Sequence, residues 1–578
     1  MFLNRRSAVS GPVEPTGPAK KAVSAKTVGA VGAAVAMVLL AALPVGAKTF
    51  VPINGAGSTW SQNALDQWAR NVNQFGMQVN YAGTGSSDGR NQFARGTVDF
   101  AVSEIPYGLV DNGVRDTPPT RKYAYMPIVA GGTSFMYNLK IGGRRVTNLR
   151  LSGDTVAKIF TGKVTNWSDP AVRADNPSLR LPARKIVPVV RSDGSGTTAQ
   201  FTLWMSKREQ SVWNDYCQRA GVQANPCGFT SEYPVVPGTG FIALNGSLGV
   251  SGYVAQAQSE GTITYVEYSY ALNSNFPVAK VLNSGGYYTE PTAPNVAVAL
   301  TQARINNDSR SADYLTQILD GVYANRDRRT YPLSSYSYLI LPTAQENGFN
   351  PDKGYTLGAF TYYFLCQGQQ QVPNLGYSPL PINLVQAGFT QVRRIPGVDP
   401  KTINVRGCHN PTFSPDGKNL LAKTAPYPQA CDKQGATPQC STGTGGAKAP
   451  TPVSNGSGSG GGGSGGGGAG SGSGQGGSGS AGAAAGSSGG ARTPGRTTSS
   501  ARAQKIDPTT GLPAGGSGQT GGSGTGDAAT VDAQPVSVQS GISPGLQHAL
   551  MALVGLLLVG VVIGPPLATR ALSRKKSP

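Results

Sequence analysis

A glycine-rich stretch of 105 residues, from Ser441 to Gly545, limits what this chain can fold into. About a third of its residues are glycine, and it contains no Phe, Trp or Tyr. A segment that buries no apolar surface cannot offset the conformational entropy that it would lose on folding. We therefore expect residues 441–545 to form a disordered stalk. Folding is then confined to residues 48–440, which suffice for two lobes with separate cores.

The first 47 residues have the organisation of an export signal. A basic leader is followed by an apolar stretch at 28–43 and by the small residues Val45-Gly46-Ala47. This pattern predicts a signal peptide over 1–47 that is cleaved after Ala47. The first cysteine of the chain is Cys217, so the sequence excludes a lipid anchor on a cysteine near the cleavage site.

An uncharged apolar segment near the C-terminus predicts a different attachment to the membrane. Ala549–Thr569 contains 21 residues without a charge. About 20 apolar residues are enough to span a bilayer, and the basic residues that follow favour a cytoplasmic end. We expect a transmembrane helix over 546–569 and a cytoplasmic basic tail over 570–578. The protein would then be a single-pass protein of the cell membrane with an exported, extracellular body.

The net charge of +20 does not indicate binding to nucleic acid. Residues 1–47 carry +4 and residues 441–578 carry +6, which leaves +10 on a body without a dense basic run. Recognition of nucleic acid needs a clustered basic face. A modest positive field favours the encounter with a small anion instead.

Six cysteines in an exported chain predict disulfide bonds. Six cysteines allow 15 pairings, and short separations favour Cys217 with Cys227 and Cys431 with Cys440, which leaves Cys366 with Cys408. Metal binding is the alternative, but the chain has no Cys-x-x-Cys motif and only two histidines, His409 and His548. We expect neither a metal nor a cofactor.

The body alternates short apolar strands with amphipathic helices. Strands are predicted at 79–81, 99–102, 186–190 and 262–268, and helices at 61–75, 154–160 and 198–205. This alternation predicts α/β lobes with largely parallel sheets. Ligands of such sheets bind at the carboxyl ends of the strands.

Three loops of small residues follow predicted strands or precede predicted helices. They are Gly55-Ala56-Gly57-Ser58-Thr59-Trp60, Gly83-Thr84-Gly85-Ser86-Ser87-Asp88-Gly89 and Arg191-Ser192-Asp193-Gly194-Ser195-Gly196-Thr197-Thr198. Backbone N–H groups in the first turn of a helix have no partner within the helix and attract anions. Each loop alone fits an ordinary helix cap. Three of them, one beginning with an arginine that suits phosphate oxygens, favour an anion site.

The loops, in this order, resemble those of the phosphate-binding protein family of ABC transporters. The segments 80–87, 97–106, 159–167 and 176–182 are also similar to the family, and the resemblance covers residues 48–387. It implies a two-lobed periplasmic-binding-protein fold joined by two hinge strands. Lobe 1 would comprise 48–130 and 264–387, lobe 2 would comprise 131–263, and residues 388–440 would form a cysteine-containing extension. We place the hinge strands near 128–133 and 261–266.

The resemblance also assigns roles to individual residues. Those expected to contact phosphate are Thr59, Trp60, Ser86, Glu104, Arg191, Ser195, Gly196 and Thr197. Asp193 would orient Arg191, or it is an ordinary helix cap. Glu104 stands where the family has Asp as acceptor for the proton of phosphate, and the alternative is a surface carboxylate at a strand end.

The expected function is therefore capture of inorganic phosphate and its delivery to an ABC permease in the same membrane, by a monomer without enzymatic activity. A phosphatase would need a metal cluster or an activated nucleophile, and the sequence offers no such group. The alternative is a cell-surface display protein that has kept the fold but binds another oxyanion or no ligand.

Overall fold

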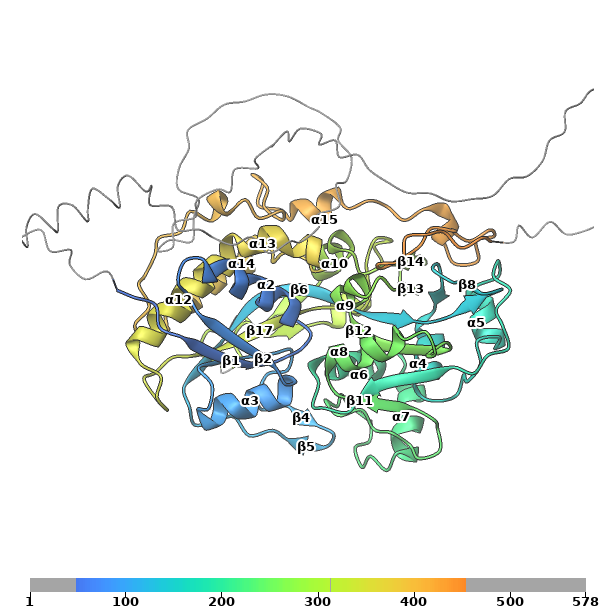
Figure 1. Cartoon of the computed structure of the whole chain (residues 1–578), viewed down its shortest axis with the longest axis horizontal. Helices are drawn as coiled ribbons and strands as arrows, with labels where there is room; N and C mark the ends of the chain where they lie inside the picture. Colours follow the sequence, from blue (N-terminus) through green and yellow to red (C-terminus); the bar gives the residue numbers. More distant parts are fainter. Residues whose placement is uncertain (1–47, 312, 454–578) are drawn as a thin grey trace, which may run out of the picture. The chain divides into compact units, whose positions relative to one another are not determined.

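The computed structural model describes residues 48–311 and 313–453, all of them within one compact unit (Figure 1). The predicted signal peptide, the stalk from residue 454, the membrane helix over 546–569 and the basic tail lie outside the described residues. Among the helices that the structure describes, none combines the length and the apolarity needed to cross a membrane.

Two hydrophobic cores divide the described body into two lobes. Helix α2 illustrates how the pattern of the sequence builds the first core. Its buried residues Ala64, Leu65, Trp68 and Val72 recur at helical spacing and face the sheet. The first lobe contains β1 Ile53–Gly57, α2 Gln62–Asn73, β2 Val79–Gly83, α3 Ser86–Arg95, β3 Phe100–Ser103, β4 Val110–Asp111, β5 Val114–Arg115, β17 Ser334–Pro342, α12 Pro351–Cys366, α13 Gly368–Gln371, η1 Val372–Leu375 and α14 Ile382–Val392.

The second lobe is built around strands β10 and β12, and helices α6 and α8 pack against these strands. It contains β7 Lys140–Ile141, β8 Arg144–Arg145, β9 Arg150–Leu151, α4 Gly153–Phe160, α5 Pro170–Asp175, β10 Val187–Arg191, α6 Gly196–Arg208, α7 Gln210–Arg219, β11 Ile242–Leu244, α8 Gly246–Val254, β12 Thr262–Glu267, α9 Tyr268–Asn273, β13 Val278–Leu282 and β14 Tyr288–Thr289. The connection back to the first lobe contains α10 Ala293–Leu300, β15 Arg304–Ile305, β16 Gln317–Ile318 and α11 Asp320–Tyr323. The strands and helices predicted from the sequence are confirmed, with ends that differ by a few residues.

Strand β6, Tyr123–Tyr137, belongs to both lobes. The sheet has the order β11-β10-β12-β6-β17-β3-β1-β2, so β6 joins its two halves. Residues 123–132 of β6 pair antiparallel with β17, and residues 133–137 pair antiparallel with β12. The outer strands pair in parallel within each lobe. The sheet is therefore mixed and not largely parallel, because the strands that join the lobes run against their neighbours.

The chain returns to the first lobe later than we expected. Buried residues from Tyr265 to Val281 pack in the cores of the second lobe. In α10 and after it the packing is divided, because Val296 joins the first core and Ala299 and Leu319 join the second. The return crossing lies at Leu333–Ser334, where the N–H of Thr133 donates to the carbonyl of Leu333 at 3.0 Å. Residues 264–289 thus belong with lobe 2, residues 293–333 contact both lobes, and the second crossing is not at 261–266. The sequence pattern identified the strand at 262–268 but not the sheet that it joins.

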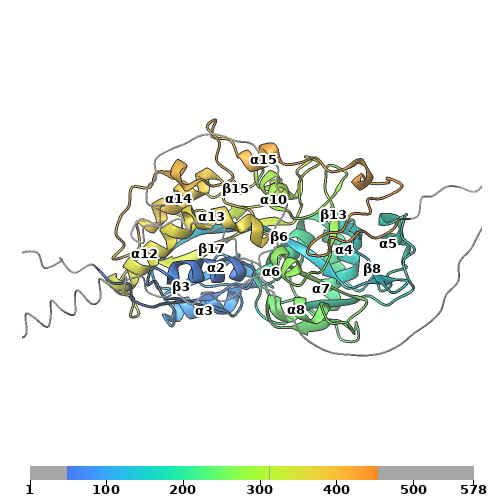
Figure 2. The same ribbon diagram turned by 45° about the horizontal axis from the view of Figure 1, so that its top comes forward.

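The extension after residue 387 runs along both lobes, from α14 past α15 Leu420–Thr424 to the second lobe (Figures 1 and 2). It also contains the short helices η2 Val405–Cys408 and η3 Ala430–Asp432. On the second lobe, Lys280 pairs with Asp432 at 2.7 Å, and both side chains are largely buried. The extension therefore contacts both lobes.

The folded body ends later than the composition predicted. Residues 441–453, expected to be part of the stalk, pack on the second lobe. Thr444 donates its N–H to the carbonyl of Thr147 at 3.0 Å, and Thr451 accepts from the N–H of Thr147 at 2.8 Å. These bonds pair backbone groups of residues 147 and 444. The glycine content of the segment did not predict this pairing.

Three disulfide bonds close the described cysteines in the predicted pairs, Cys217 with Cys227, Cys366 with Cys408, and Cys431 with Cys440. The bond from Cys366 of α12 to Cys408 holds the start of the extension against the first lobe.

Candidate functional site

The first small-residue loop connects β1 to α2 and is buried between the lobes. Ser58 donates a hydrogen bond to Oε2 of Glu104 at 2.7 Å and accepts one from the N–H of Trp60 at 3.0 Å. Thr59 Oγ1 lies 2.7 Å from Oγ of Ser247, which belongs to the second lobe. The loop therefore holds both an internal bond and a bond across the lobes.

Trp60 is fully buried and packs edge-on against Tyr377, with 5.7 Å between the ring centroids. The hydroxyl of Tyr377 donates to the carbonyl of Trp60 at 2.6 Å. The large ring therefore fixes the backbone at the start of α2. Trp60 was expected to contact an anion, but its backbone N–H donates to the hydroxyl of Ser58 in this structure.

The second loop places Ser86 at the first turn of α3. Gly85 before it has φ of 98°, a left-handed conformation that side chains disfavour. Ser86 Oγ donates to Oε2 of Glu104 at 2.9 Å and accepts from the N–H of Gly196 at 3.1 Å. Gly196 belongs to the second lobe, so Ser86 links two of the predicted loops.

The third loop carries the buried cation of the site. Arg191, whose side chain is 2 % exposed, donates through Nε to Oδ1 of Asp193 at 2.7 Å, and its Nη2 pairs with the other oxygen of Asp193. Nη1 donates to Ser247 at 3.3 Å. Asp193 thus holds the guanidinium by two oxygens, the geometry expected of an orienting residue. One proton on each terminal nitrogen is left for another acceptor.

Helix α6 begins at the same loop and directs its N-terminus toward the first lobe. Ser195 is its N-cap and accepts from the N–H of Thr198 at 3.1 Å. The hydroxyl of Thr197 is buried and has no partner among the described residues. A buried hydroxyl without a partner is costly, so this oxygen is available to a ligand.

Glu104 lies where the lobes meet and is 1 % exposed. Its carboxylate accepts hydrogen bonds from Ser58, Ser86 and Ser337. Burial raises the pKa of this carboxyl above its ordinary range, and the serine hydroxyls offset part of that rise. A Cβ atom on Gly196 would lie 1.9 Å from Oε2 of Glu104, so a larger residue there would displace the carboxylate. Glu104 is therefore not a surface carboxylate at a strand end.

Several residues of the site were missed by the sequence analysis. Ser247 contacts both Thr59 and Arg191, and Ser337 contacts Glu104. Tyr265 accepts from the N–H of Arg191 at 3.1 Å. Ser247 lies in a segment Gly246-Ser247 that opens α8, and such a Gly-Ser pair was the signal that could have identified it.

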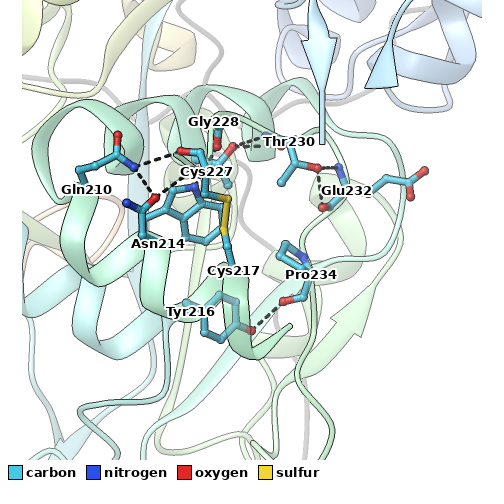
Figure 3. The surroundings of a disulfide bond; sticks show 11 residues. Gln210, Asn214, Tyr216, Cys217, Cys227, Gly228, Thr230, Glu232 and Pro234 are labelled. Atoms are coloured by element: carbon cyan, nitrogen blue, oxygen red, sulfur yellow. Dashed lines mark hydrogen bonds between the residues drawn. A yellow bond between two sulfur atoms is a disulfide. The ribbon is translucent and has the colours of Figure 1, made fainter. Parts of the chain in front are cut away.

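The loop after the first disulfide also reaches the site. Figure 3 shows Cys217 of α7 bonded to Cys227, with Asn214 of the same helix accepting from the N–H of Cys227 at 2.8 Å. Further along this loop, the carbonyl of Ser231 accepts from the N–H of Ser195 at 2.9 Å. The disulfide therefore supports the loop that holds the N-cap of α6.

The arrangement suits a small oxyanion. Hydroxyls, first-turn N–H groups of α6 and one oriented guanidinium converge from both lobes, and such donors favour negative charge. Within the described part of the chain, no group of three or more His, Cys, Asp or Glu could hold a metal ion.

Comparison with known proteins gives consistent matches. The model of a PBP superfamily domain matches residues 20–367. A phosphate-binding protein PstS of Xylella fastidiosa is 31% identical over 339 residues, covering 58% of this chain and 83% of that protein. A phosphate-binding protein PstS of Haemophilus influenzae is 29% identical over 334 residues, covering 58% of this chain and 90% of that protein. A solved phosphate-binding protein from Stenotrophomonas maltophilia is 20% identical, with a TM-score of 0.43 over 58% of this chain and 92% of that chain.

Proposed function

We propose that this chain, which belongs to the PBP superfamily, captures inorganic phosphate between its two lobes and delivers it to an ABC-type importer. The contact between Ser86 of the first lobe and Gly196 of the second carries the proposal. This contact brings the second and third small-residue loops together at Glu104, and Arg191, which Asp193 orients, lies in the third loop. Relatives that are named phosphate-binding proteins support the choice of anion.

Binding would use hydrogen-bond donors that have no partner among the described residues, or whose present partner is another residue of the site. The remaining protons of Arg191 and the hydroxyl of Thr197 would bond to phosphate oxygens. The hydroxyl of Ser86 would exchange Glu104 for phosphate as its acceptor. Glu104 would then accept the proton of phosphate, which sulfate lacks at neutral pH. Selectivity of this kind arises because a ligand without the proton would leave a buried acceptor unpaired.

The proposal extends to how the body is held at the cell surface. The basic leader of 1–47 would export it, and the apolar segment 546–569 would tether it with the tail 570–578 in the cytoplasm. Residues 454–545 would form a flexible link between the folded body and the membrane. A monomer that does not catalyse a reaction suits a carrier that meets a permease in the same membrane.

Calorimetric titration of the full-length chain in detergent tests the proposal. We expect phosphate to bind with a dissociation constant of about 1 μM or below, roughly −8 kcal/mol, and sulfate to bind at least about tenfold more weakly. Replacing Arg191 by Ala should abolish the binding of phosphate. Absence of phosphate binding, or equal affinity for sulfate, would overturn the proposal.

One observation favours a second candidate. The carboxylate of Glu104 already accepts from Ser58, Ser86 and Ser337, as an oxyanion would. A display protein that keeps the fold but no oxyanion would have such a self-satisfied site. The same titration distinguishes the candidates, because the display protein would bind neither phosphate nor sulfate.

A further inference from the structure

A cavity of about 360 Å³ lies on the first lobe and shares no residue with the interlobe site. It is formed by three parts of the chain: residues 118–125 before and within β6, residues 309–311 with Tyr314 after β15, and Gln391 with Arg394 at the end of α14. We propose that this cavity is a second binding site, and that it takes an organic phosphate. The proposal does not depend on what binds between the lobes.

Positive charge dominates the wall of the cavity. Arg121, Lys122, Arg310 and Arg394 line it, and no carboxylate is among the lining residues that the structure describes. Only one of these cations is in an ion pair within the described residues, the exposed pair of Arg310 with Asp308 at 3.3 Å. Because three of the four cations have no ion-pair partner among the described residues, the cluster creates a field that attracts an anion.

Carboxylates lie near the cavity but do not line it: Asp99 and Glu346 interact with Arg121, and Asp313 interacts with Tyr123. Glu346 accepts from the backbone N–H of Lys122 at 2.9 Å, which leaves the ammonium of Lys122 unpaired by that contact. Arg121 is buried and donates to the carbonyls of Phe93 and Val98 at 2.9 Å and 2.8 Å. Arg121 therefore adds a buried charge behind the wall, while Lys122 and Arg394 present exposed charges.

A buried amide is oriented by one of these cations. Gln391 is 1 % exposed, and its Oε1 accepts from Nη1 of Arg394 at 3.0 Å. Because Oε1 of Gln391 faces Arg394, Nε2 is the end of the amide that faces away from the arginine. Nε2 of Gln391 has no partner among the described residues. A buried donor without an acceptor is unfavourable. A ligand oxygen that reaches Nε2 would therefore form a hydrogen bond without breaking an existing one.

The C-terminal part of the cavity wall lies outside the region of family similarity. The superfamily match ends at residue 367, whereas Gln391 and Arg394 follow it on α14 and after its end. Helix α14 contacts β6, and α12, α13 and α14 lie together on the first lobe (Figure 2). The cavity therefore combines residues of the region that matches the superfamily with two residues of the extension, Gln391 and Arg394.

The size and the walls of the cavity suggest the class of ligand. Ligand cavities measure roughly 300–1,000 Å³, so about 360 Å³ exceeds the need of a bare anion and suits a small organic molecule. Guanidinium groups match phosphate oxygens in geometry. Pro118, Pro119 and Tyr314 give an apolar wall that a sugar ring can pack against. A phosphate ester on a sugar-sized group satisfies both parts of the wall.

The test uses glucose 6-phosphate as the probe and the full-length chain with Arg191→Ala, so that the interlobe site is disabled. We expect calorimetry to show binding of glucose 6-phosphate that weakens steeply with salt, and no binding of glucose. Adding Arg394→Ala should weaken the affinity at least about tenfold, the change expected when one charge-assisted contact is lost. Inorganic phosphate is titrated in parallel, and weaker binding than the ester is expected.

Arg393→Ala is the matched control, because it removes the same charge from the adjacent exposed residue, which does not line the cavity. Its affinity should equal that of the Arg191→Ala parent. No binding of the ester at millimolar concentration, or equal effects of the two arginine substitutions, would overturn the proposal. Tighter binding of inorganic phosphate than of the ester would overturn the choice of an organic ligand. Failure of the interlobe site is read separately, from phosphate titration of the chain with Arg191 intact.

Discussion

The side-chain oxygen of Ser86 accepts a hydrogen bond from the backbone N–H of Gly196 at 3.1 Å, although 110 residues separate them. Ser86 begins a helix of the first lobe, and Gly196 begins a helix of the second. The bond therefore exists only when the lobes are close. Substitutions around it test whether lobe closure and anion binding are coupled.

Gly196→Ala should weaken phosphate binding at least about tenfold, or about 1.4 kcal/mol. The new Cβ would lie 1.9 Å from Glu104 and 2.5 Å from Ser86, which prevents the lobes from approaching as they do here. Calorimetry gives the affinity, and small-angle X-ray scattering gives the change in radius. Gly252→Ala is the control, because a Cβ there meets no atom within 4 Å. Unchanged affinity in Gly196→Ala would contradict the coupling.

Arg191→Lys should also reduce phosphate affinity by at least about tenfold, since an ammonium cannot reproduce a planar guanidinium fork. Lysine keeps the charge but cannot bond to both oxygens of Asp193 and to Ser247 together. The comparison is Arg184→Lys, a half-exposed arginine of the same lobe that pairs with Glu260. Equal affinities of the two variants would mean that charge alone is sufficient.

Glu104 should make stability depend on pH. Burial raises the pKa of its carboxyl in the folded state, so the folded protein holds this proton to higher pH than the unfolded chain. Stability therefore falls as the pH rises from the ordinary glutamate pKa to the raised one, by at most about 1.4 kcal/mol per pH unit. Glu104→Gln should remove this slope. Urea unfolding of both proteins between pH 4 and pH 8 gives the difference, and parallel curves would refute the prediction.

Trp60→Phe should leave phosphate affinity unchanged within about threefold, below 1 kcal/mol. The indole N–H is buried without a partner among the described residues, so its removal breaks no bond. Phe retains a ring that can pack against Tyr377. Trp60→Ala, in contrast, should lower the unfolding free energy by about 3–5 kcal/mol through the cavity that it leaves. Thermal and denaturant unfolding separate these outcomes.

Removal of the Cys366–Cys408 bond by double alanine substitution should cost more stability than removal of Cys431–Cys440. The bonded cysteines are 42 and 9 residues apart, and longer closed loops restrict the unfolded chain more. The chain-entropy relation gives roughly 4 and 2.5 kcal/mol respectively. Guanidinium unfolding of the oxidised proteins measures both losses. The reverse order would show that native contacts of the extension, and not loop length, determine its stabilisation.

The sequence by itself predicted four of the strands, three of the helices and the three small-residue loops, and it favoured the disulfide pairs that are observed. These follow from signals within short segments, such as glycine before a helix, apolar periodicity and the spacing of cysteines. It also identified Arg191, Asp193 and Ser86, because a charged or hydroxyl residue at the end of a strand or the start of a helix is a local signal of an anion site.

Only the tertiary structure decided that Ser247 and Ser337 join the site, because Thr59 and Ser247 are 188 residues apart and Glu104 and Ser337 are 233 apart. It likewise assigned residues 264–289 to the second lobe and brought Arg394 and Lys122 to the wall of the same cavity. A single serine or arginine has no local pattern that reveals its distant neighbour. Such contacts depend on how strands pair and how helices pack, and the free energy of that packing is shared by the whole chain.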